Sequence, residues 1–371
     1  MRIFLDYRAA LRARTGVGET VHETARALVA TAPPGEELVL FSSSWKDRLD
    51  PGVVPGARTI DRRIPVRVIN AAWHRLGRPT IEQITGEIFD VAHAMHPLKL
   101  PAKDAAQIVT LHDLDFLDHP ERTRAEIRRD YPALAADHAR TADQVIAVSA
   151  HTAADARTRF GLAEDRVSIC RPGAPSWPHR RDEPSDGCIL FLGTLEPRKN
   201  LGVLLDAYER LLATRTRLPR LVLAGRATDA SADIVARVRR KPLAGLVDLP
   251  GYIDPVRRAA LYEQALVFVL PSHTEGFGMP ALEAMTIGVP VIAANAGALP
   301  EAVGTAGALF APGDAAELAA TLAAIVDDAN RRDRMRNAGW QHVAGFTWTR
   351  TAHAVRDAWQ RGIEHRKTRR G

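Results

Sequence analysis

The chain has 371 residues, 46% of them hydrophobic and 25% charged, which suits about two globular domains. No apolar run approaches the ~18 residues of a membrane span, and the first residues lack the apolar core and cleavage site of a signal peptide. The two cysteines, Cys170 and Cys188, form neither a disulfide framework nor a metal-binding pattern. These features predict a cytosolic protein with reduced cysteines.

The formal net charge is +6, and the basic residues are nearly all arginine. Arginine richness is common where a genome is rich in GC, but a basic surface can also attract nucleic acid, anionic lipid or phosphorylated ligands. The sequence has no zinc finger, RNA-recognition signature or basic tract interleaved with aromatics. We therefore expect no nucleic-acid partner.

Short apolar strands alternate with amphipathic helices along the chain. The predicted strands cover residues 2–6, 37–43, 107–113, 144–150, 188–194, 220–225, 265–272 and 290–295. Helical patterns lie between them, for example at 18–31 and 201–215, and a last one covers 350–365. Such alternation is typical of parallel sheets that helices cover on both faces.

The sequence pattern changes near residue 172, where a stretch rich in proline, glycine and charged residues interrupts the alternation of strands and helices. We predict an N-terminal α/β domain at 1–172, a linker at 173–187, a C-terminal α/β domain at 188–345 and a final helix within 346–371. Both domains are expected to be doubly wound, with a cleft between them.

Candidate site residues lie at the C-terminal ends of several predicted strands, at the sheet edge where such folds bind ligands. They are His112, Asp113, Ser149, Gly193 and Glu275. Glu275 belongs to a loop that is otherwise small or apolar, and Glu283 follows in a helix predicted to start near Pro280 and end at Gly288. A buried carboxylate needs partners, which are either protein groups or the hydroxyls of a ligand.

The segment "EGFGMPALE", residues 275–283, resembles the E-x7-E signature of retaining nucleotide-sugar glycosyltransferases of family 4, which have the GT-B fold. The resemblance covers essentially the whole chain. It includes "TGVGETVHETARAL" (15–28), "VTLHDLDFL" (109–117), "FLGTLEPRKNLGVLLDAYERL" (191–211) and "FTWTRTAHAV" (346–355). It implies an α/β protein of two doubly wound, Rossmann-like domains that face a central cleft, with the last helix crossing back onto the first domain.

The resemblance also implies roles for individual residues. Glu275 would contact the donor sugar and stabilise the transition state, and Glu283 would hold the ribose hydroxyls. Arg198 and Lys199 would bind the donor diphosphate, and Thr194 stands where the family often has a further arginine. His112 would lie near the reaction centre. The loop and helix start would contribute donor contacts from Gly276, Phe277, Gly278 and Met279.

Gly16, Val17 and Gly18 resemble the family's glycine loop, expected just before a helix and beside the acceptor or the donor phosphate. The phrase "GTLEPRKN" (193–200) resembles bacterial mannosyltransferases of the family, which favours GDP-mannose as donor, with a UDP-hexose as the alternative. The expected acceptor is a hydroxyl of a glycan or a lipid-linked sugar in cell-surface polysaccharide synthesis. No cofactor is expected.

Two other patterns in the sequence suggest a metal site or a different enzyme class. Asp113 and Asp115 form an Asp-x-Asp, which binds a divalent metal in the other large glycosyltransferase fold, but the GT-B resemblance argues against a metal here. A nicotinamide oxidoreductase would need G-x-G-x-x-G after a strand, whereas "GVGETV" has Val21 in place of the third glycine.

A basic segment at 58–78 interleaves arginines with apolar residues and Trp73. Such a segment can lie on an anionic membrane or can be a solvated helix of its own domain. The first reading predicts a peripheral protein at the inner face of the plasma membrane.

Overall fold

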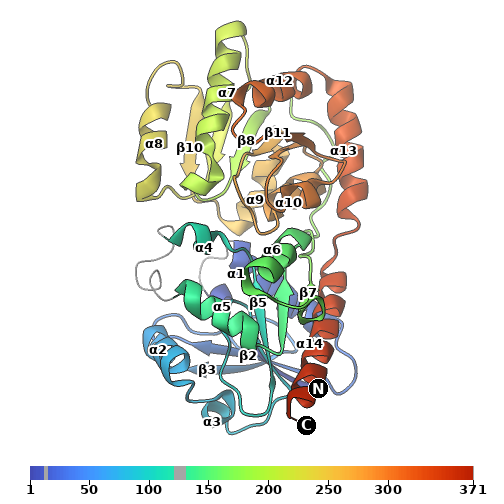
Figure 1. The fold of residues 1–371 in the computed structure, drawn as a ribbon. Coiled ribbons are helices and arrows are strands. Elements are labelled where there is room, and N and C mark those ends of the chain that lie inside the picture. Colours follow the sequence, from blue (N-terminus) through green and yellow to red (C-terminus); the bar gives the residue numbers. More distant parts are fainter. Residues whose placement is uncertain (12–15, 121–130, 371) are drawn as a thin grey trace. The chain divides into compact units, whose positions relative to one another are not determined.

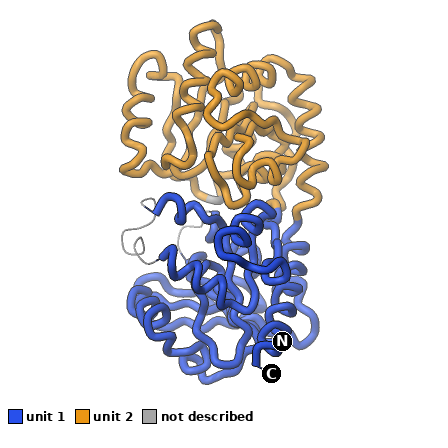
Figure 2. Tube along the Cα trace, in the orientation of Figure 1, with its two compact units in different colours: residues 1–173, 347–371 blue, residues 174–346 orange. Residues whose placement is uncertain are grey.

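A computed structural model of the protein describes residues 1–11, 16–120 and 131–370. The chain divides into two compact units (Figures 1 and 2). Unit 1 comprises residues 1–173 and 347–371, and unit 2 comprises residues 174–346. Unit 2 is therefore continuous in sequence, whereas unit 1 is built from two separate stretches.

Across its described residues, unit 1 folds around a seven-stranded parallel sheet in the order β3-β2-β1-β4-β5-β6-β7. The strands are β1 Arg2–Asp6, β2 Glu37–Ser43, β3 Arg58–Arg62, β4 Val91–Ala94, β5 Ala106–Leu111, β6 Gln144–Ala147 and β7 Val167–Ile169. The helices are α1 Gly16–Ala30, α2 Val66–Leu76, α3 Ile81–Thr85, α4 Asp115–Asp118, α5 Tyr131–Thr141, α6 Ala150–Phe160 and α14 Trp348–Arg370.

Unit 2 repeats the plan with a six-stranded parallel sheet in the order β10-β9-β8-β11-β12-β13. Its strands are β8 Cys188–Leu192, β9 Leu221–Ala224, β10 Val247–Gly251, β11 Ala265–Leu270, β12 Val291–Ala294 and β13 Ala308–Phe310. Its helices are α7 Leu201–Thr214, α8 Ala232–Val238, α9 Pro255–Glu263, α10 Met279–Ile287, α11 Leu299–Val303, α12 Ala315–Val326 and α13 Ala329–Val343. In each sheet the strand order reverses beside the first strand, which is the switch point where doubly wound folds bind ligands.

The sheet of unit 1 has an apolar core on each face. Phe4 of β1 packs into the core on the α2 and α5 side, while its neighbours Ile3 and Leu5 pack into the core that holds Trp359 of α14. This alternation follows from the two-residue period of a strand. The fully buried Trp359 donates its indole N–H to Nδ1 of His93 at 3.2 Å, so α14 is an integral part of unit 1.

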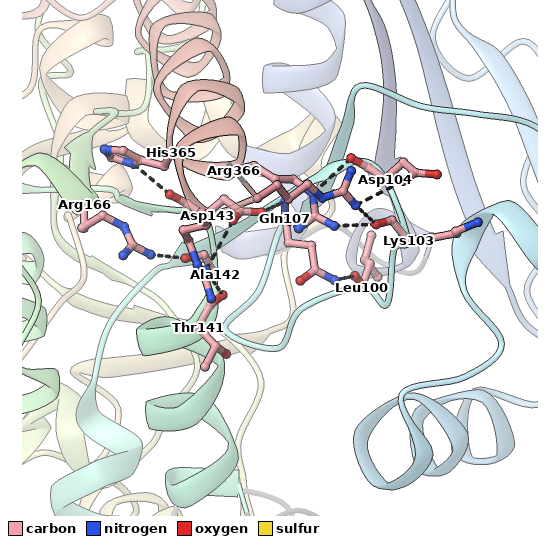
Figure 3. Close-up of polar contacts among 12 residues, drawn as sticks. Leu100, Lys103, Asp104, Gln107, Thr141, Ala142, Asp143, Arg166, His365 and Arg366 are labelled. Carbon is pink, nitrogen blue, oxygen red and sulfur yellow. Dashed lines mark hydrogen bonds and ion pairs between the residues drawn. The ribbon is translucent and has the colours of Figure 1, made fainter.

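The far end of α14 is held by a polar cluster around Asp143, at the start of β6 (Figure 3). Asp143 is 1% exposed, and its Oδ2 accepts hydrogen bonds from the Gln107 backbone N–H at 2.8 Å and from Arg366 Nη1 at 3.0 Å. His365 of the same helix contacts the Asp143 carbonyl oxygen at 3.0 Å. A buried carboxylate thus ties a basic helix end to the sheet, and the arginine offsets its burial.

The α/β class and the doubly wound GT-B architecture predicted from sequence are confirmed. Every predicted strand overlaps an observed strand, although several predicted ends run too far, as at 144–150, where β6 stops at Ala147. Five further strands, β3, β4, β7, β10 and β13, were not predicted. Residues 174–187, expected as a linker, count with unit 2, and Arg180 there is buried with Nη1 donating to the Ala265 carbonyl oxygen at 2.6 Å.

Within the described parts of the chain, no helix has both the length and the apolar character needed to cross a membrane.

Candidate active site

The loop between β11 and α10 shapes the principal site of unit 2. The buried strand β11 ends at Leu270, and Gly278 caps α10 with φ of +110°, a conformation that disfavours any other residue. A Cβ atom on Gly278 would also lie 3.0 Å from Leu299 Cδ2. Pro280 falls in the first turn and Gly288 ends the helix, so the predicted course of this segment is confirmed.

Glu275 projects from this loop into a cluster of cations. It is 8% exposed. Lys199 Nζ lies 2.5 Å from its Oε1, Arg198 Nη1 lies 3.2 Å from its Oε2, and Ser272 donates its hydroxyl to Oε1 at 2.7 Å. Two cations and one hydroxyl therefore satisfy a single buried carboxylate, which is what its burial requires.

The charge state of Glu275 follows from these contacts. Burial alone raises the pKa of Glu275, but attraction to Lys199 and Arg198, with hydrogen bonds from Lys199 and Ser272, outweighs it. The pKa is held below the ordinary value of 4.5, so Glu275 is ionised at neutral pH.

The two cations come from the loop after β8. A short 3-10 turn at Pro197–Lys199 leads into α7 through Asn200, whose φ is +51°. Lys199 is itself buried, at 6% exposed, while Arg198 is shared between Glu275 and Glu196, whose Oε1 lies 2.5 Å from Arg198 Nε. The amide of His273 donates to the Arg198 carbonyl oxygen at 2.9 Å, so this loop and the Glu275 loop are also joined through their backbones.

Glu283 lies in the second turn of α10 and is 4% exposed. Arg258 Nη1 lies 2.6 Å from its Oε1, and the Tyr262 hydroxyl donates to Oε2 at 2.9 Å. Both partners belong to α9. Burial first, and then the Glu283 carboxylate, raise the pKa of Tyr262 well above its usual value, so the tyrosine keeps its proton and acts as a donor.

The remaining donor-side residues of the prediction are spread around the same loops. Phe277 is buried and its ring lies 5.7 Å from that of Phe346, so its side chain is part of the core. Thr194 is partly buried. The backbone of its neighbour Gly193 passes very close to Gly225, since a Cβ on Gly225 would lie 1.8 Å from the Gly193 carbonyl oxygen. Met279 begins α10, where backbone amides with no helical partner favour an anion.

His112 belongs to unit 1, directly after β5. Its Nε2 lies 3.1 Å from the Met95 carbonyl oxygen, and a carbonyl only accepts, so Nε2 carries the proton and Nδ1 is an acceptor. Burial lowers the pKa of His112 to about 4, despite the opposing Met95 hydrogen bond. The imidazole is therefore neutral at pH 7 and its Nδ1 can accept a hydrogen bond from a ligand hydroxyl.

The glycine segment of unit 1 differs slightly from its prediction. Helix α1 begins at Gly16, so Gly16, Val17 and Gly18 form its first turn and do not precede it; Thr15 lies outside the described residues. A Cβ on Gly18 would lie 2.8 Å from the Ala9 carbonyl oxygen, whereas one on Gly16 would meet nothing within 4 Å. Gly18 is thus required by close packing, whereas no atom of the described residues would crowd a side chain at Gly16.

The Asp-x-Asp forms a local turn at the start of α4, where the Asp115 amide donates to Asp113 Oδ1 at 3.2 Å. Over residues 1–11, 16–120 and 131–370, no group of three or more His, Cys, Asp or Glu side chains is arranged to hold a metal ion.

The basic segment 58–78 is not one element. Its first part is strand β3 and its second part is α2, whose Ile69 and Trp73 are 2% exposed and belong to the core. Trp73 is therefore not a surface residue, and the Arg8 guanidinium lies over its ring at 4.9 Å. The exposed large apolar side chains of α2 are Val66, Val68 and Leu76, at 38%, 58% and 75% exposed.

Several site residues had no sequence signal. Ser272 was read only as the end of a strand, and Arg258 and Tyr262 lie too far from Glu283 in sequence for any spacing rule to link them. Unit 1 adds a buried ion pair at the end of β1, where Arg8 Nη2 lies 2.5 Å from Asp6 Oδ2 and His96 Nε2 contacts the same oxygen at 2.9 Å.

The similarity of the chain to known proteins agrees with this geometry. Two family models match it, Glycosyltransferase Family 4 over residues 14–175 and Glycosyl transferases group 1 over residues 178–342. O-antigen chain mannosyltransferase B of Escherichia coli is 30% identical over an alignment of 262 residues that covers 67% of this chain and 68% of that protein. D-inositol 3-phosphate glycosyltransferase 2 of Catenulispora acidiphila is 31% identical over an alignment of 292 residues that covers 73% of this chain and 65% of that protein.

Among solved structures, sucrose-phosphate synthase from Thermosynechococcus elongatus superposes with a TM-score of 0.78 at 21% identity, covering 97% of this chain and 98% of that chain. At that identity the similarity shows the fold. Together with the two family matches and the mannosyltransferase relative, it places the chain in glycosyltransferase family 4, as a glycosyltransferase of the GT-B type.

Proposed function

We propose that the protein transfers a hexose from a nucleoside diphosphate sugar to an acceptor hydroxyl with retention at the anomeric carbon. The bond from the anomeric carbon to the diphosphate oxygen breaks, and a bond to the acceptor oxygen forms. The nucleoside diphosphate leaves with the bonding electrons and the acceptor hydroxyl loses its proton. The observation that carries the proposal is the buried cluster of Glu275, Lys199 and Arg198.

The cluster suits the charges of this reaction. Lys199 and Arg198 would neutralise the departing diphosphate, and the amides at the start of α10 would add partial positive charge. Glu275 is held ionised and would stabilise the positive charge that develops on the sugar. Glu283 would bind the ribose hydroxyls, since each carboxylate oxygen can accept more than one hydrogen bond.

Two features of unit 1 are proposed to take part as well. His112 would accept a hydrogen bond from a sugar hydroxyl at Nδ1, because its Nε2 is committed to Met95. The open start of α1 at Gly16 and Val17 would lie beside the acceptor or a donor phosphate. With the diphosphate neutralised by side chains and amides, the proposal requires neither a metal ion nor a cofactor.

The first choice of donor is GDP-mannose, supported by the similarity to a mannosyltransferase and by the "GTLEPRKN" segment. A UDP-hexose is the second choice. The test is the shift in melting temperature with GDP, UDP, NAD or an oligonucleotide, because a ligand at 100 times its Kd stabilises by about 2.7 kcal/mol. A shift with NAD alone would contradict the proposal and favour an oxidoreductase.

Turnover completes the test. GDP-mannose and UDP-hexoses are incubated with short glycan acceptors, and the anomeric configuration of the product is read by NMR. Retention is expected. Inversion would contradict the mechanism assigned to Glu275, and absence of transfer from every nucleotide sugar would contradict the proposed activity.

The acceptor is proposed to be a glycan or lipid-linked sugar of cell-surface polysaccharide synthesis, reached at the inner face of the plasma membrane. The exposed Val66, Val68 and Leu76 of α2 stand among exposed arginines, which suits an anionic bilayer. The test is sedimentation with vesicles of phosphatidylglycerol or phosphatidylcholine. Replacing Arg63 and Arg75 with Gln should weaken binding to the anionic vesicles only, and replacing the exposed Arg239 and Arg240 of unit 2 is the control.

A further inference from the structure

The loop after β12, residues 295–298, lies directly against the backbone of Glu275. The Ala298 amide donates a hydrogen bond to the Glu275 carbonyl oxygen at 3.3 Å. Gly297 has φ of +57°, in the left-handed region. A Cβ atom on Gly297 would lie 3.0 Å from the Glu275 nitrogen, 3.2 Å from its carbonyl oxygen and 3.4 Å from Thr274 Cα. All three atoms belong to the backbone, so none can rotate away as a side chain would.

The Glu275 segment is also held by the loop after β8, which carries Arg198 and Lys199. Lys199 Nζ binds Glu275 Oε1 at 2.5 Å, and the His273 amide donates to the Arg198 carbonyl oxygen at 2.9 Å. The Glu275 segment is therefore fixed by two loops. One contacts its carboxylate with cations, and the other contacts its backbone through a residue that has no side chain.

We propose that Gly297 is a positioning residue for Glu275. Because Gly297 has no side chain, the 295–298 loop can pack against the Glu275 backbone closely enough for the Glu275 carboxylate to contact Lys199. The proposal rests on the proposed function, in which the place of that carboxylate relative to the sugar sets the rate. Gly297 lies outside the glutamate signature, and its role follows only from the contact between the two loops.

Replacing Gly297 with Ala should move the Glu275 backbone by a few tenths of an ångström, because contacts of 3.0–3.2 Å are tighter than most real Cβ contacts. Catalytic groups need to stay within about 0.5 Å of their productive positions. A misplacement of about 1 Å costs roughly 10²-fold, so we expect kcat to fall about 3–10-fold. The KM for the donor should change less than kcat, because the sugar's reacting centre is affected more than the diphosphate.

The matched control is Gly313→Ala. Gly313 also has a left-handed backbone, with φ of +85°, but a Cβ there would meet no atom within 4 Å. This variant therefore has an alanine in a left-handed backbone conformation but does not displace the Glu275 backbone. Equal losses of kcat in the two variants would overturn the proposal, because strain alone would then explain them.

A second measurement does not depend on sugar transfer. The carboxyl carbons of labelled glutamates are titrated by 13C NMR, and Glu275→Gln assigns the Glu275 signal. In the parent protein Glu275 should titrate below 4.5. In Gly297→Ala its pKa should rise, because weaker contact with Lys199 leaves the effect of burial less opposed, while Gly313→Ala should match the parent.

The two readouts separate the two claims. A parent protein that transfers no sugar would overturn the proposed function, and the titration would still decide the positioning role. An unchanged Glu275 titration in Gly297→Ala would overturn that role. If Gly297→Ala fails to fold, Ala298→Pro replaces it, because proline removes the amide that donates to Glu275 and should likewise raise the pKa of Glu275.

Discussion

The two buried glutamates of unit 2 are alike in exposure but differ in their partners. Glu275, on a loop, is contacted by two cations and a serine hydroxyl that come from its own loop and the loop after β8. Glu283, on a helix, is contacted by one arginine and one tyrosine, both from α9. The first carboxylate lies between two cations, one of which, Arg198, also contacts Glu196, whereas the second is contacted by one cation and one neutral donor.

This difference shows which of the two sites can exchange partners. A diphosphate can take over contacts of the cations around Glu275, because the Arg198 side chain is 23% exposed and divides its contacts between Glu275 and Glu196. Glu283 is contacted by one arginine and one neutral hydroxyl, an environment that suits the hydroxyls of a ligand. We therefore expect changes at the first site to alter the rate and changes at the second to alter donor binding.

The largest expected effect is that of Lys199→Ala. It removes charge from the departing diphosphate and also the closest partner of Glu275, so kcat should fall about 10²–10³-fold, as for the loss of one oxyanion donor. The exposed Lys241→Ala is the control for the loss of a lysine. Steady-state kinetics with the identified donor measure both, and a Lys199→Ala variant as active as the control would remove the diphosphate assignment.

Glu275→Gln should follow, with kcat lower by about 10²-fold, since the shape is kept but the charge that meets the transition state is lost. Because the substitution also frees Lys199 and Arg198 from their carboxylate, the bare nucleoside diphosphate should bind as tightly as before or more tightly. Calorimetry measures that affinity. Clearly weaker binding would mean that Glu275 supports the donor site in the ground state, contrary to the comparison.

Glu283→Gln should mainly raise the KM of the donor, by about tenfold, and leave kcat nearly unchanged, because a ribose contact acts equally in the ground and transition states. Glu263→Gln, at an exposed position near the end of α9, is the matched control. If Glu283→Gln instead only lowers the melting temperature, Glu283 is a structural residue that joins α9 to α10.

The pH dependence of stability distinguishes Glu275 further. Its pKa is lowered in the folded protein, so its stabilising contribution is complete above its unfolded pKa, near 4.5, and is lost as the pH falls through the folded pKa. The difference in melting temperature between the parent and Glu275→Gln should therefore shrink below pH 4.5. Buried neutral histidines such as His93 also destabilise the fold in acid, but they act equally in both proteins and cancel in the difference. A difference that grows in acid would contradict the ion-pair assignment.

The smallest expected effect is that of a chelator. If side chains and helix amides neutralise the diphosphate, turnover should persist in excess EDTA. Loss of activity that Mg²⁺ or Mn²⁺ restores would mean that the cations around Glu275 are insufficient, and it would bring Asp113 and Asp115 back into consideration.

Local patterns in the sequence predicted the elements that carry the glutamates. The run "ALVFVL" with Pro271 predicted β11, and Pro280 with Gly288 predicted α10. Short strands such as β4 (Val91–Ala94) were missed because a histidine interrupts their apolar pattern, although tertiary contacts bury that His93 completely. The contact between Glu275 and Lys199 could not be predicted from local patterns, because only the folded sheet brings together the loops that follow β8 and β11.

The division of the chain has a consequence for synthesis. All of unit 2 lies within 174–346, so it can fold as soon as that stretch has left the ribosome. Unit 1 begins first but still lacks α14, and with it Trp359, which fills the core beside Ile3 and Leu5. The unit that starts the chain is therefore the last to be completed. Because Gly173 lies against the backbone of Trp348, a direct join between 173 and 347 would offer a way to make unit 1 alone.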